Sequence, residues 1–382
     1  MKGDSASAKP IRCLHIASGD LWAGAEVQIY NLVSRLHGMP GVAPYVVLLN
    51  EGALAERLRE VGVDVTILDE QRLSGWAIFQ KLRNLIHRTG IDIVHTHRHK
   101  EHILGALAAR MTNTPSIRTV HGRSEHKAAL TDLRRRVLQT LDRFTARFLQ
   151  KDVIAVSEIL GTELAEQFPQ GKIVVIPNGV DLTHISRLPQ PPAREALGAR
   201  PMEIAVVGRL APVKRLDLVL DITAELENRH PGTFRFFIYG DGPLRGAMQA
   251  RAAQLLPGEV VTFAGFRSDV LERLNEHDAL LITSDHEGLP TNLLEALALG
   301  KPVVARKVGE IPLVLGQELT DYSVDADTAG PFAAALEVLH HRLVNKSVNP
   351  DLARKRAALY SADASASQYG HLYEKIAGRT SA

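Results

Sequence analysis

Short apolar runs rich in Val and Ile alternate with helical segments along almost the whole chain, and they do so in two successive series. Continuous apolar runs of this length are typical of strands that are buried on both faces, as in a parallel sheet covered by helices. The pattern predicts an α/β protein with two Rossmann-like, doubly wound parallel-sheet domains. The runs of the first series are 11–17, 43–50, 63–69, 91–97, 116–122, 152–158 and 172–182. Those of the second are 202–210, 234–242, 260–266, 279–284 and 302–308.

A length of 382 residues suits two such domains better than a single core. The proline-rich stretch RLPQPPAR at 187–194 is the most linker-like part of the sequence. Ligands of doubly wound sheets bind beyond the carboxyl ends of the strands, so we expect the two domains to face a cleft. The predicted divisions are a tail (1–10), an N-terminal acceptor-binding domain (11–185), a linker (186–200), a C-terminal nucleotide-sugar domain (201–355) and a helix crossing back to the first domain (356–378).

Charge and cysteine content limit the possible environments. Residues 1–150 contain 21 Lys and Arg against 14 Asp and Glu, whereas residues 151–350 contain 19 against 26. This asymmetry suggests different partners for the two halves, although solvated helix faces explain most of the charges.

The single cysteine, Cys13, rules out an internal disulfide and fits a reducing compartment. No run approaches the ~20 apolar residues of a membrane span, and the start lacks the apolar core of a signal peptide, so we expect a cytoplasmic protein.

The segment DHEGLPTNLLEALALG at 285–300 has the form of a ligand-binding helix start. Glu287 follows a predicted strand, and Pro290 suits the first helical turn, where its missing N–H costs nothing. The first amides of such a helix, here at 291–292, attract phosphate through their N–H groups and the helix dipole. Glu295, inside the helix, can reach the same ligand, and a carboxylate pairs well with vicinal hydroxyls. The alternative is that Glu287 is a helix cap and Glu295 faces solvent.

A second segment, VVGRLAPVKRLD at 206–217, carries two cations at the end of a predicted strand. Gly208 and Arg209 close the strand, and Lys214 opens the next helix. The planar guanidinium group of Arg and the ammonium group of Lys can hold a pyrophosphate and neutralise the charge of a departing phosphate. Ordinary surface cations are the alternative, but surface cations are rarely placed at the carboxyl end of a core strand.

Glycines end two further strands of the second series. Gly240 and Gly242 lie in FIYGDGP, and Gly265 lies in FAGFRSDV. Glycine lets the backbone approach a flat ligand closely. We expect Phe266 and Arg267, which follow Gly265, to bracket a nucleobase, mostly through main-chain contacts.

The first half offers fewer candidates. SGDLWAGAE at 18–26 departs from the G-x-G-x-x-G dinucleotide pattern, although Gly24 at the helix start can approach a diphosphate. TVHG places His121 at the carboxyl end of a strand. HTHRHKEH at 95–102 has the histidine density of a metal site, but the run passes from strand into helix and its side chains are expected to point apart. We therefore predict no metal site there.

Seven pieces of sequence occur in an order that carries a family likeness: GAE (24–26), TVHG (119–122), AVSE (155–158), IPNGVD (176–181), VGRLAPVKRLD, GDGP and EGLPTNLLE. With these pieces, residues 11–378 resemble the family-4 retaining glycosyltransferases of the GT-B fold. Glu287 and Glu295 match the E-x7-E signature of that family. AGAE is a departure, because Ala23 stands where the family often has a second glycine.

The resemblance implies a role for each candidate residue. Arg209 and Lys214 would hold the diphosphate of a sugar nucleotide, and Glu295 would bind the ribose hydroxyls. Glu287 would bind a hydroxyl of the donor sugar, beside which His121 would lie. The remaining implied donor-site residues are Gly24, Gly208, Gly240, Phe266, Arg267, Gly288, Leu289, Pro290 and Thr291.

The implied chemistry is transfer of a hexosyl or N-acetylhexosaminyl group from a UDP- or GDP-sugar to a hydroxyl of a lipid-linked, lipopolysaccharide or polysaccharide acceptor. No metal ion or other cofactor is expected, because no D-x-D-type pair lies beside the donor segments, and no nucleic-acid partner is expected. A front-face displacement, in which the departing phosphate takes the acceptor proton, fits best. The basic amphipathic segment 130–151 either contacts an anionic membrane, as a peripheral protein on the cytoplasmic face of the inner membrane would, or packs on its sheet.

Two other functions remain open. A sugar-nucleotide epimerase has a similar two-domain form, but epimerases characteristically carry a GTRPE stretch after the first strand, where this chain has SGDLWAGAE. The other is a non-catalytic nucleotide-binding module. Such a module would have lost catalytic activity, and the presence of Arg209, Lys214, Glu287 and Glu295 together argues against that loss.

Overall fold

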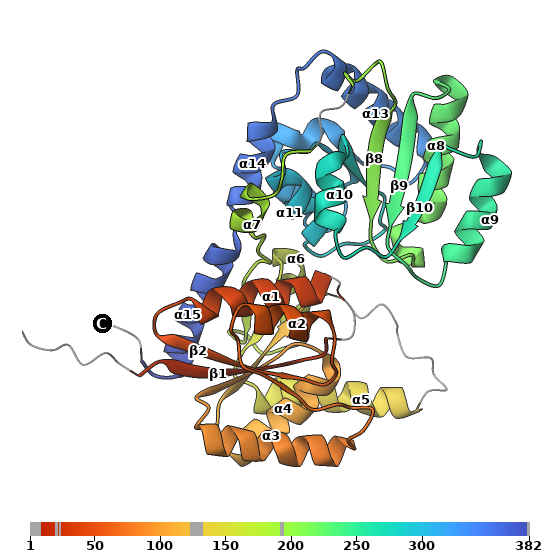
Figure 1. Cartoon of the computed structure of the whole chain (residues 1–382). Coiled ribbons are helices and arrows are strands. Elements are labelled where there is room, and N and C mark those ends of the chain that lie inside the picture. Colours follow the sequence, from red (N-terminus) through yellow and green to blue (C-terminus); the bar gives the residue numbers. More distant parts are fainter. Residues whose placement is uncertain (1–8, 20–21, 23, 123–132, 192–194, 380–382) are drawn as a thin grey trace, which may run out of the picture. The chain divides into compact units, whose positions relative to one another are not determined.

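The computed structural model describes residues 9–19, 22, 24–122, 133–191 and 195–379. The chain divides into two compact units (Figure 1). Unit 1 contains residues 1–179 and 362–382, and unit 2 contains residues 180–361. Each unit has its own parallel sheet and its own apolar clusters.

The described part of unit 1 contains a seven-stranded sheet in the order β3-β2-β1-β4-β5-β6-β7, and each neighbouring pair is parallel. Helices cover both of its faces, with α1 and α2 on one side and α3 and α4 on the other (Figure 1). The strands are β1 (Ile11–Ala17), β2 (Val42–Leu48), β3 (Val65–Ile67), β4 (Ile93–Thr96), β5 (Ser116–Val120), β6 (Val153–Ala155) and β7 (Ile173–Val175). The helices are α1 (Gly24–His37), α2 (Ala53–Glu60), α3 (Gly75–Thr89), α4 (His99–Met111), α5 (Leu133–Phe144), a π-helical turn (Thr145–Leu149), α6 (Glu158–Ala165) and α15 (Ala362–Ile376).

Helix α3 shows how local sequence sets the ends of an element. Ser74 caps its start, because the Ser74 side chain accepts a hydrogen bond from the Ala77 amide at 3.2 Å. Gly90 ends it in the left-handed conformation (φ 62°, ψ 48°), which glycine adopts without a steric cost.

The described part of unit 2 contains a six-stranded sheet in the order β10-β9-β8-β11-β12-β13, also with parallel neighbours. The strands are β8 (Met202–Val207), β9 (Phe234–Tyr239), β10 (Val261–Gly265), β11 (Ala279–Ile282), β12 (Val303–Arg306) and β13 (Ser323–Val324). The helices are α7 (Leu182–Ser186), α8 (Leu216–Arg229), α9 (Arg245–Leu255), α10 (Val270–Glu276), α11 (Thr291–Ala298), α12 (Ile311–Leu315), α13 (Ala329–Val344) and α14 (Pro350–Ala358), with 3₁₀ turns at Pro212–Lys214 and Gln317–Tyr322.

The chain passes between the units at 179–180 and at 361–362, which differs from the predicted boundaries at 185 and 355. The physical reason is a pairing of Val180 with Ser361, supported by a 2.8 Å bond from the Val180 amide to the Tyr360 carbonyl. Residues 180–186 therefore pack with the core of unit 2, to which Val180 and Ile185 contribute. The predicted helix 356–378 is instead the end of α14 and, after a break, α15, which packs on α1 in unit 1.

Two other expectations need correction. Strand β13 was not predicted, because two residues in an acidic surrounding give no apolar run. Pro290 does not lie in the first turn of α11. It precedes the helix with an extended backbone (φ −72°, ψ 126°), and the helix begins at Thr291. The predicted helix 130–151 corresponds to α5 and the π-helical turn from residue 133 onward, and residues 130–132 lie outside the described residues.

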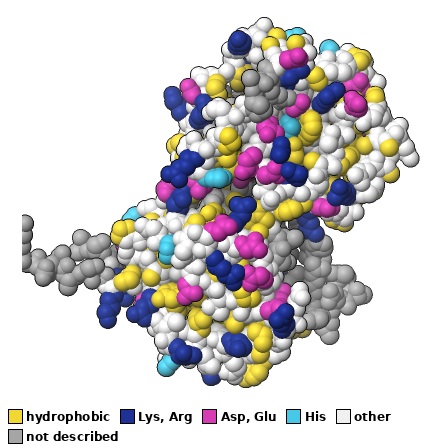
Figure 2. Space-filling model, in the orientation of Figure 1, with side chains coloured by type: hydrophobic (Ala, Val, Ile, Leu, Met, Phe, Trp, Pro, Cys, Tyr) yellow, Lys and Arg dark blue, Asp and Glu magenta, His cyan; other side chains and the backbone are white. Residues whose placement is uncertain are grey.

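The surface carries mixed charge. On the face drawn in Figure 2, basic and acidic side chains are interspersed rather than collected by sign. This arrangement is typical of a solvated surface. Among the described helices, none combines the length and apolar character needed to cross a membrane.

Candidate active site

The segments that follow β8 and β9 in unit 2 pack so closely that only glycine fits. A Cβ atom on Gly240 would lie 2.0 Å from the Gly208 carbonyl oxygen, and one on Gly242 would lie 2.6 Å from the Leu210 carbonyl oxygen. Both glycines have positive φ, 137° and 159°. Because β8 and β9 are neighbours in the sheet, their carboxyl ends form one backbone-lined edge. A flat or phosphorylated ligand can approach such an edge closely.

Lys214 and Glu287 meet at this edge. The Lys214 Nζ atom lies 2.6 Å from Glu287 Oε1, and the Ser284 hydroxyl donates to the same oxygen at 2.6 Å. The Asp285 amide donates to the Val213 carbonyl at 2.9 Å and so ties the loop after β11 to the loop after β8. Glu287 is only 8% exposed. Ser284 was not predicted, although its position three residues before Glu287 in the same loop is a usable signal.

Gly309 supports the Glu287 loop from behind, and it too was missed in the sequence. Its φ is +54°, and a Cβ atom there would lie 1.8 Å from the Glu287 carbonyl oxygen. The next residue, Glu310, donates its amide to the Gly288 carbonyl at 3.2 Å. The signal is a glycine just after β12, at the same edge of the sheet. The position of Glu287 therefore depends on a residue 22 positions further along the chain.

Helix α11 starts at the same edge. The Asn292 side chain donates to the Val207 carbonyl at the end of β8, at 2.8 Å, and this bond fixes the first turn against the sheet. As in any helix, the first N–H groups of α11 have no acceptor within the helix itself. They carry the positive end of the helix dipole, which favours an anion at this end. Asn292 is a third positioning residue that the sequence did not identify.

Glu295 lies on α11 one turn further along, and it is only partly exposed. Burial, together with the nearby Glu272 charge, raises the pKa of Glu295 from 4.5 to about 8. Among the described residues its carboxyl group makes no hydrogen bond and no ion pair. A partly buried carboxyl group without a protein partner is a typical place for ligand hydroxyls to bind.

The remaining predicted residues of unit 2 lie beyond neighbouring strand ends. Arg209 follows β8 and is exposed, and Phe266 follows β10 with 54% of its surface exposed. Arg267 donates to Asp269 from Nε and from one terminal nitrogen, at 2.8 Å each, and this pairing keeps the pKa of Asp269 well below its usual value. The Gly240 amide donates to the Gly265 carbonyl at 2.8 Å, so the ends of β9 and β10 are also joined. The structure thus places all the predicted residues of unit 2 along one edge of its sheet.

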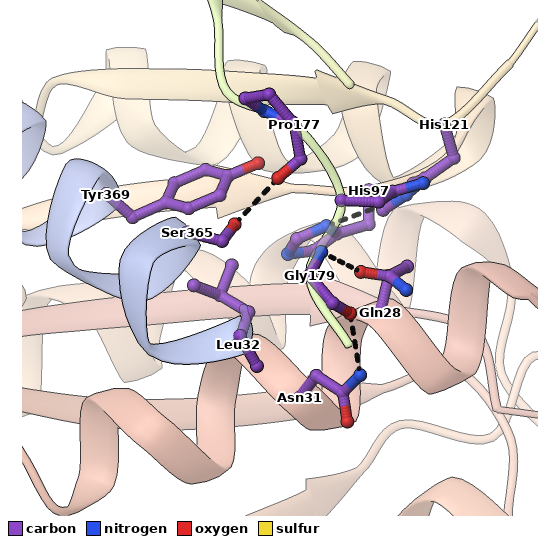
Figure 3. A pocket seen from close by; sticks show the side chains of 11 residues that line it. Gln28, Asn31, Leu32, His97, His121, Pro177, Gly179, Ser365 and Tyr369 are labelled. Atoms are coloured by element: carbon purple, nitrogen blue, oxygen red, sulfur yellow. Dashed lines mark hydrogen bonds between the residues drawn. The ribbon is translucent and has the colours of Figure 1, made fainter. Parts of the chain in front are cut away.

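The two predicted residues of unit 1 lie at the carboxyl edge of the other sheet. Gly24 is the exposed first residue of α1. Two residues later, fully buried Glu26 pairs with Arg98. His121 follows β5 and lines a pocket of unit 1 (Figure 3). Figure 3 shows His97 pointing toward His121, with Gln28 and Asn31 of α1 bonded to the backbone of Gly179. The pocket residues are Gln28, Asn31, Leu32, His97, His121, Pro177, Asn178, Gly179, Ala362, Ser365 and Tyr369.

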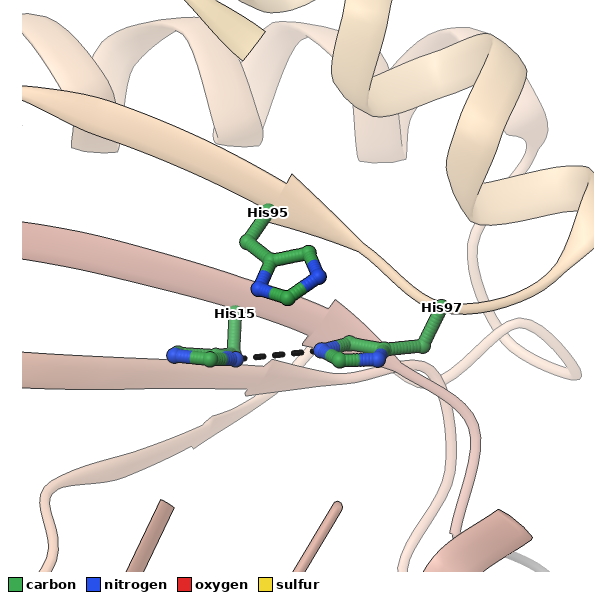
Figure 4. A group of neighbouring side chains, drawn as sticks. All are labelled: His15, His95 and His97. Atoms are coloured by element: carbon green, nitrogen blue, oxygen red, sulfur yellow. Dashed lines mark hydrogen bonds between the residues drawn. The ribbon is translucent and has the colours of Figure 1, made fainter. Parts of the chain in front are cut away.

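The histidines of the 95–102 run do not all point apart, and that expectation is wrong for two of them. His95 and His97 lie on the same side of their strand, with ring centroids 4.2 Å apart, next to His15 of β1 (Figure 4). Residues two apart in a strand share a face, which the sequence-based interpretation overlooked. His102 lies instead in α4, where its Nδ1 is 2.8 Å from the Thr96 hydroxyl.

Comparison with known proteins agrees with this arrangement. Residues 22–184 match the family model described as Glycosyltransferase Family 4, and residues 192–346 match the model described as Glycosyl transferases group 1. A D-inositol 3-phosphate glycosyltransferase of Actinosynnema mirum is 28% identical over 64% of this chain and 63% of its own length. A UDP-Gal:alpha-D-GlcNAc-diphosphoundecaprenol alpha-1,3-galactosyltransferase of Escherichia coli is 27% identical over 67% of this chain and 68% of its own.

The fold has a close counterpart among solved structures. HepE of Anabaena, in complex with UDP-glucose, superimposes with a TM-score of 0.77 at 20% identity, over 95% of this chain and 99% of HepE. At this identity the likeness shows the fold alone, and it confirms the predicted GT-B class. Since the two family models follow one another along the chain and each covers most of one unit, the chain is a family-4-like glycosyltransferase of the GT-B type.

Proposed function

We propose that the protein is a retaining glycosyltransferase that uses a nucleoside diphosphate sugar as donor. The observation that carries this proposal is the edge of the unit 2 sheet, where Lys214, Glu287, Glu295 and the start of α11 meet the glycine-lined ends of β8 and β9. A diphosphate needs cations and amide donors, a ribose needs a carboxylate, and a nucleobase needs close backbone approach. This edge supplies all three.

Arg209, Lys214 and the first amides of α11 bind the diphosphate. In the unliganded protein Lys214 is paired with Glu287. Donor binding therefore replaces this ion pair with contacts to the donor, and it does not have to order a free Lys214 side chain. Lys214 then turns to the phosphate, while Glu287 and the main chain of Gly288, Leu289 and Thr291 bind a hydroxyl of the sugar. The E-x7-E spacing of Glu287 and Glu295 serves to place the sugar and the ribose at the two ends of one donor.

Glu295 binds the ribose hydroxyls, and the backbone near Phe266 and Arg267 contacts the base. The side chain of Arg267 is held by Asp269, which supports a main-chain role. We expect uridine to be the base, because HepE, which shares the fold, is seen with UDP-glucose. Guanosine is the second candidate.

The reaction is a front-face displacement. The bond between the anomeric carbon and the leaving phosphate oxygen breaks, and the acceptor oxygen forms a bond to the same carbon on the same face. The departing phosphate takes the acceptor proton, so atoms and charge balance without a separate base. Arg209, Lys214 and the α11 amides stabilise the negative charge that develops on the phosphate. We propose that this step needs no metal ion.

We propose that the acceptor is a hydroxyl of a lipid-linked, lipopolysaccharide or polysaccharide glycan. One relative acts on a diphosphoundecaprenol-linked sugar, by its name. The exposed surface of α5 and the following turn supports a lipid-linked acceptor. Five of its apolar side chains remain 43–63% exposed, and exposed cations lie between them. The apolar residues are Val137, Leu138, Leu141, Phe144 and Phe148, and the cations are Arg136, Arg143 and Arg147. We propose that this surface contacts an anionic membrane.

The experiment that tests the donor chemistry uses the full-length protein with labelled UDP- and GDP-sugars and no acceptor. Slow release of free sugar and nucleoside diphosphate, in the presence of EDTA, supports a metal-independent transferase. An interconverted sugar nucleotide supports an epimerase instead, and an unchanged donor that still binds supports a non-catalytic module. NMR of the released sugar then reports the anomeric configuration at the moment of release, and the opposite anomer contradicts the retaining mechanism.

A further inference from the structure

The turn that carries Lys214 is held by the segment of chain that leaves β11. Thr283 is the first residue after β11, and it is only 2% exposed. Its hydroxyl donates to the Lys214 carbonyl oxygen at 2.9 Å and lies 3.4 Å from the Arg215 carbonyl oxygen. Strands β8 and β11 are parallel neighbours, so the segments that follow them leave the same edge of the unit 2 sheet. The main chain of Lys214 is thus bonded to a strand other than the one that precedes it.

Two further contacts join the same segments. The Asp285 amide donates to the Val213 carbonyl at 2.9 Å, and Arg215 Nη1 donates to Asp285 Oδ1 at 3.1 Å. The guanidinium of Arg306, at the end of β12, binds the same carboxylate oxygen. The segment after β11 therefore holds three successive residues of the turn, and β12 supports that segment in its place.

Arg215 has a backbone conformation that residues with a side chain rarely adopt. It lies between the 3₁₀ turn Pro212–Lys214 and α8, in the left-handed region with φ 50° and ψ 49°. Such a conformation is unfavourable for a residue other than glycine, and it persists only where the surroundings determine it. Here the Arg215 side chain binds the Asp217 carboxylate at 3.0 Å in addition to Asp285. These ion pairs hold the bend that directly follows Lys214.

The side chain of Lys214 is held separately from its main chain. Its stem passes the end of β8, since a Cβ atom on Gly208 would lie 3.5 Å from Lys214 Cε. Its Nζ lies 2.6 Å from Glu287 Oε1. When a donor replaces this ion pair, the contact between Nζ and Glu287 is lost. The bonds to the main chain do not involve the ion pair, so they remain when the donor is bound.

We propose that Thr283 and Arg215 are positioning residues that fix the main chain of Lys214, so that its ammonium group reaches the diphosphate after the ion pair with Glu287 has opened. The ammonium group stands on a flexible four-carbon stem, and only a fixed backbone limits where it can go. Both residues act through Lys214. This inference rests on the proposed function, because it takes Lys214 as a ligand of the diphosphate.

The first test removes the Thr283 hydroxyl and keeps the shape of the side chain. Thr283→Val leaves the Lys214 carbonyl without this donor, and we expect the UDP affinity of the full-length protein to fall about 10-fold. Isothermal titration calorimetry measures the affinity. Thr283→Ser restores a hydroxyl and should bind UDP as the parent does. Parental affinity in Thr283→Val overturns the proposal.

Thr223→Val is the matched control. Thr223 lies on α8 in the same unit, is fully buried and donates its hydroxyl to the Val219 carbonyl at 2.8 Å. The control therefore removes the same kind of bond by the same substitution. It should change the Tm alone and leave the UDP affinity as in the parent. An equal loss of affinity in both variants would show that reduced stability, rather than the position of Lys214, is responsible, and would overturn the proposal.

A double-mutant cycle shows whether Thr283 acts through Lys214. In the Lys214→Gln background, Thr283→Val should weaken UDP binding no further, because the ammonium group that Thr283 positions is gone. A merely structural role would weaken binding by the same factor in both backgrounds. Such additive losses overturn the proposal.

Variants of Arg215 test the bend without altering a buried side chain. Arg215→Asn and Arg215→Val both remove the guanidinium, but Asn tolerates the left-handed conformation and Val does not. We expect Arg215→Val to bind UDP at least about 3-fold more weakly than Arg215→Asn does. Equal affinities would show that this conformation does not position Lys214, and would overturn the proposal. This comparison stands even if Thr283→Val does not fold.

Lys214→Gln alone separates this inference from the proposed function. If it leaves the UDP affinity unchanged, Lys214 is not a ligand of the diphosphate, and the proposed donor site fails together with this inference. If Lys214→Gln weakens UDP binding and Thr283→Val does not, only this inference fails.

Discussion

At the scale of single residues, Glu295 offers the most direct test of ribose binding. Its pKa of about 8 means that the carboxyl group is mostly protonated at pH 7 in the unliganded protein. Ribose hydroxyls that donate to the carboxylate favour its ionised form, so UDP binding should release a proton at pH 7. Isothermal titration calorimetry in buffers of different ionisation enthalpy measures that proton. Its release should fade by pH 9, where the group is already ionised.

The matched variant is Glu295→Gln, which keeps the shape and removes the charge. It should abolish the release of a proton on UDP binding and weaken UDP binding about 10–100-fold, the loss expected for hydrogen bonds to a charged group.

The same substitution should raise the stability of the unliganded protein at high pH. A raised pKa means that the protonated group stabilises the fold below pH 4.5 and that this contribution is lost as pH rises through 8. Glu295→Gln should therefore have a higher Tm than the parent at pH 9. Equal proton release by both proteins would contradict the ribose assignment.

Lys214 tests the diphosphate assignment. Lys214→Gln removes the cation that faces both Glu287 and the proposed leaving phosphate. Loss of one charge-stabilising group at a developing oxyanion lowers the rate about 100-fold or more, and we expect donor hydrolysis to fall by that factor. Arg235→Gln is the control, because Arg235 is an exposed cation near the start of β9, at the opposite end of the strand. Equal losses in the two variants would show that a general charge effect, rather than this site, is responsible.

Gly309 tests the support of the Glu287 loop. In Gly309→Ala the new methyl group would lie 1.8 Å from the Glu287 carbonyl, at a φ that alanine rarely adopts. We expect Glu287 to move and donor hydrolysis to fall at least 10-fold, with the Tm lowered by several degrees. Gly258→Ala, in a glycine with open space around it, is the control. Wild-type rates in Gly309→Ala would show that the position of Glu287 does not depend on this contact.

At the scale of elements, the sequence predicts strands well because burial on both faces leaves a continuous apolar run. Every predicted strand segment contains a strand, and the misses are explained by length or by distant partners. Strand β13 has two residues, and the break between α14 and α15 depends on the pairing of Ser361 with Val180, 181 residues earlier. Gly309, Asn292 and the contact of His15 with His97 were missed for the same reason. Their partners lie on neighbouring strands that are far apart in sequence, and no local pattern reports such neighbours.

Helix α5 and its π-helical turn carry the membrane prediction. Phe144 and Phe148 are 50% and 63% exposed, with ring centroids 5.0 Å apart, and the Arg147 guanidinium lies 5.7 Å from the Phe148 ring. Transfer of one such ring from water into the acyl boundary stabilises binding by about 1.5–3 kcal/mol. The double variant Phe144→Ser/Phe148→Ser should therefore reduce sedimentation with vesicles of anionic phospholipid at least 10-fold.

The control for this surface is Leu359→Ser, which removes an exposed apolar side chain at the end of α14 in unit 2. It should leave vesicle binding unchanged. Raising the salt concentration should weaken binding of the parent protein, because part of the attraction to anionic lipid is electrostatic. Vesicle binding that persists in the double variant would defeat the membrane proposal and leave the donor site unaffected.

At the scale of the whole molecule, the chain builds two bodies that do not follow its linear order. Unit 1 begins the chain and, with α15, also ends it. Tyr369 and Tyr373 of α15 are buried in unit 1, where their hydroxyls contact Thr119 and His95. Unit 1 carries 25 Lys and Arg against 20 Asp and Glu, and unit 2 carries 20 against 23. The stability of unit 1 therefore depends on the last helix, whereas the proposed donor contacts of Lys214, Glu287 and Glu295 lie wholly in unit 2.

This division predicts two thermal transitions with different sensitivities. UDP at 100 times its dissociation constant stabilises the body that binds it by about 2.7 kcal/mol, or roughly 5–10 °C for a body of this size. We expect calorimetry of the full-length protein to show a transition that UDP raises and a second that it leaves nearly in place. Tyr373→Phe, which removes the hydroxyl that bonds His95, should lower only the second transition. Lys214→Gln should reduce the UDP shift of the first. If UDP raises the transition that Tyr373→Phe lowers, the nucleotide binds chiefly to unit 1, and the assignment of the donor site to the edge of the unit 2 sheet is wrong.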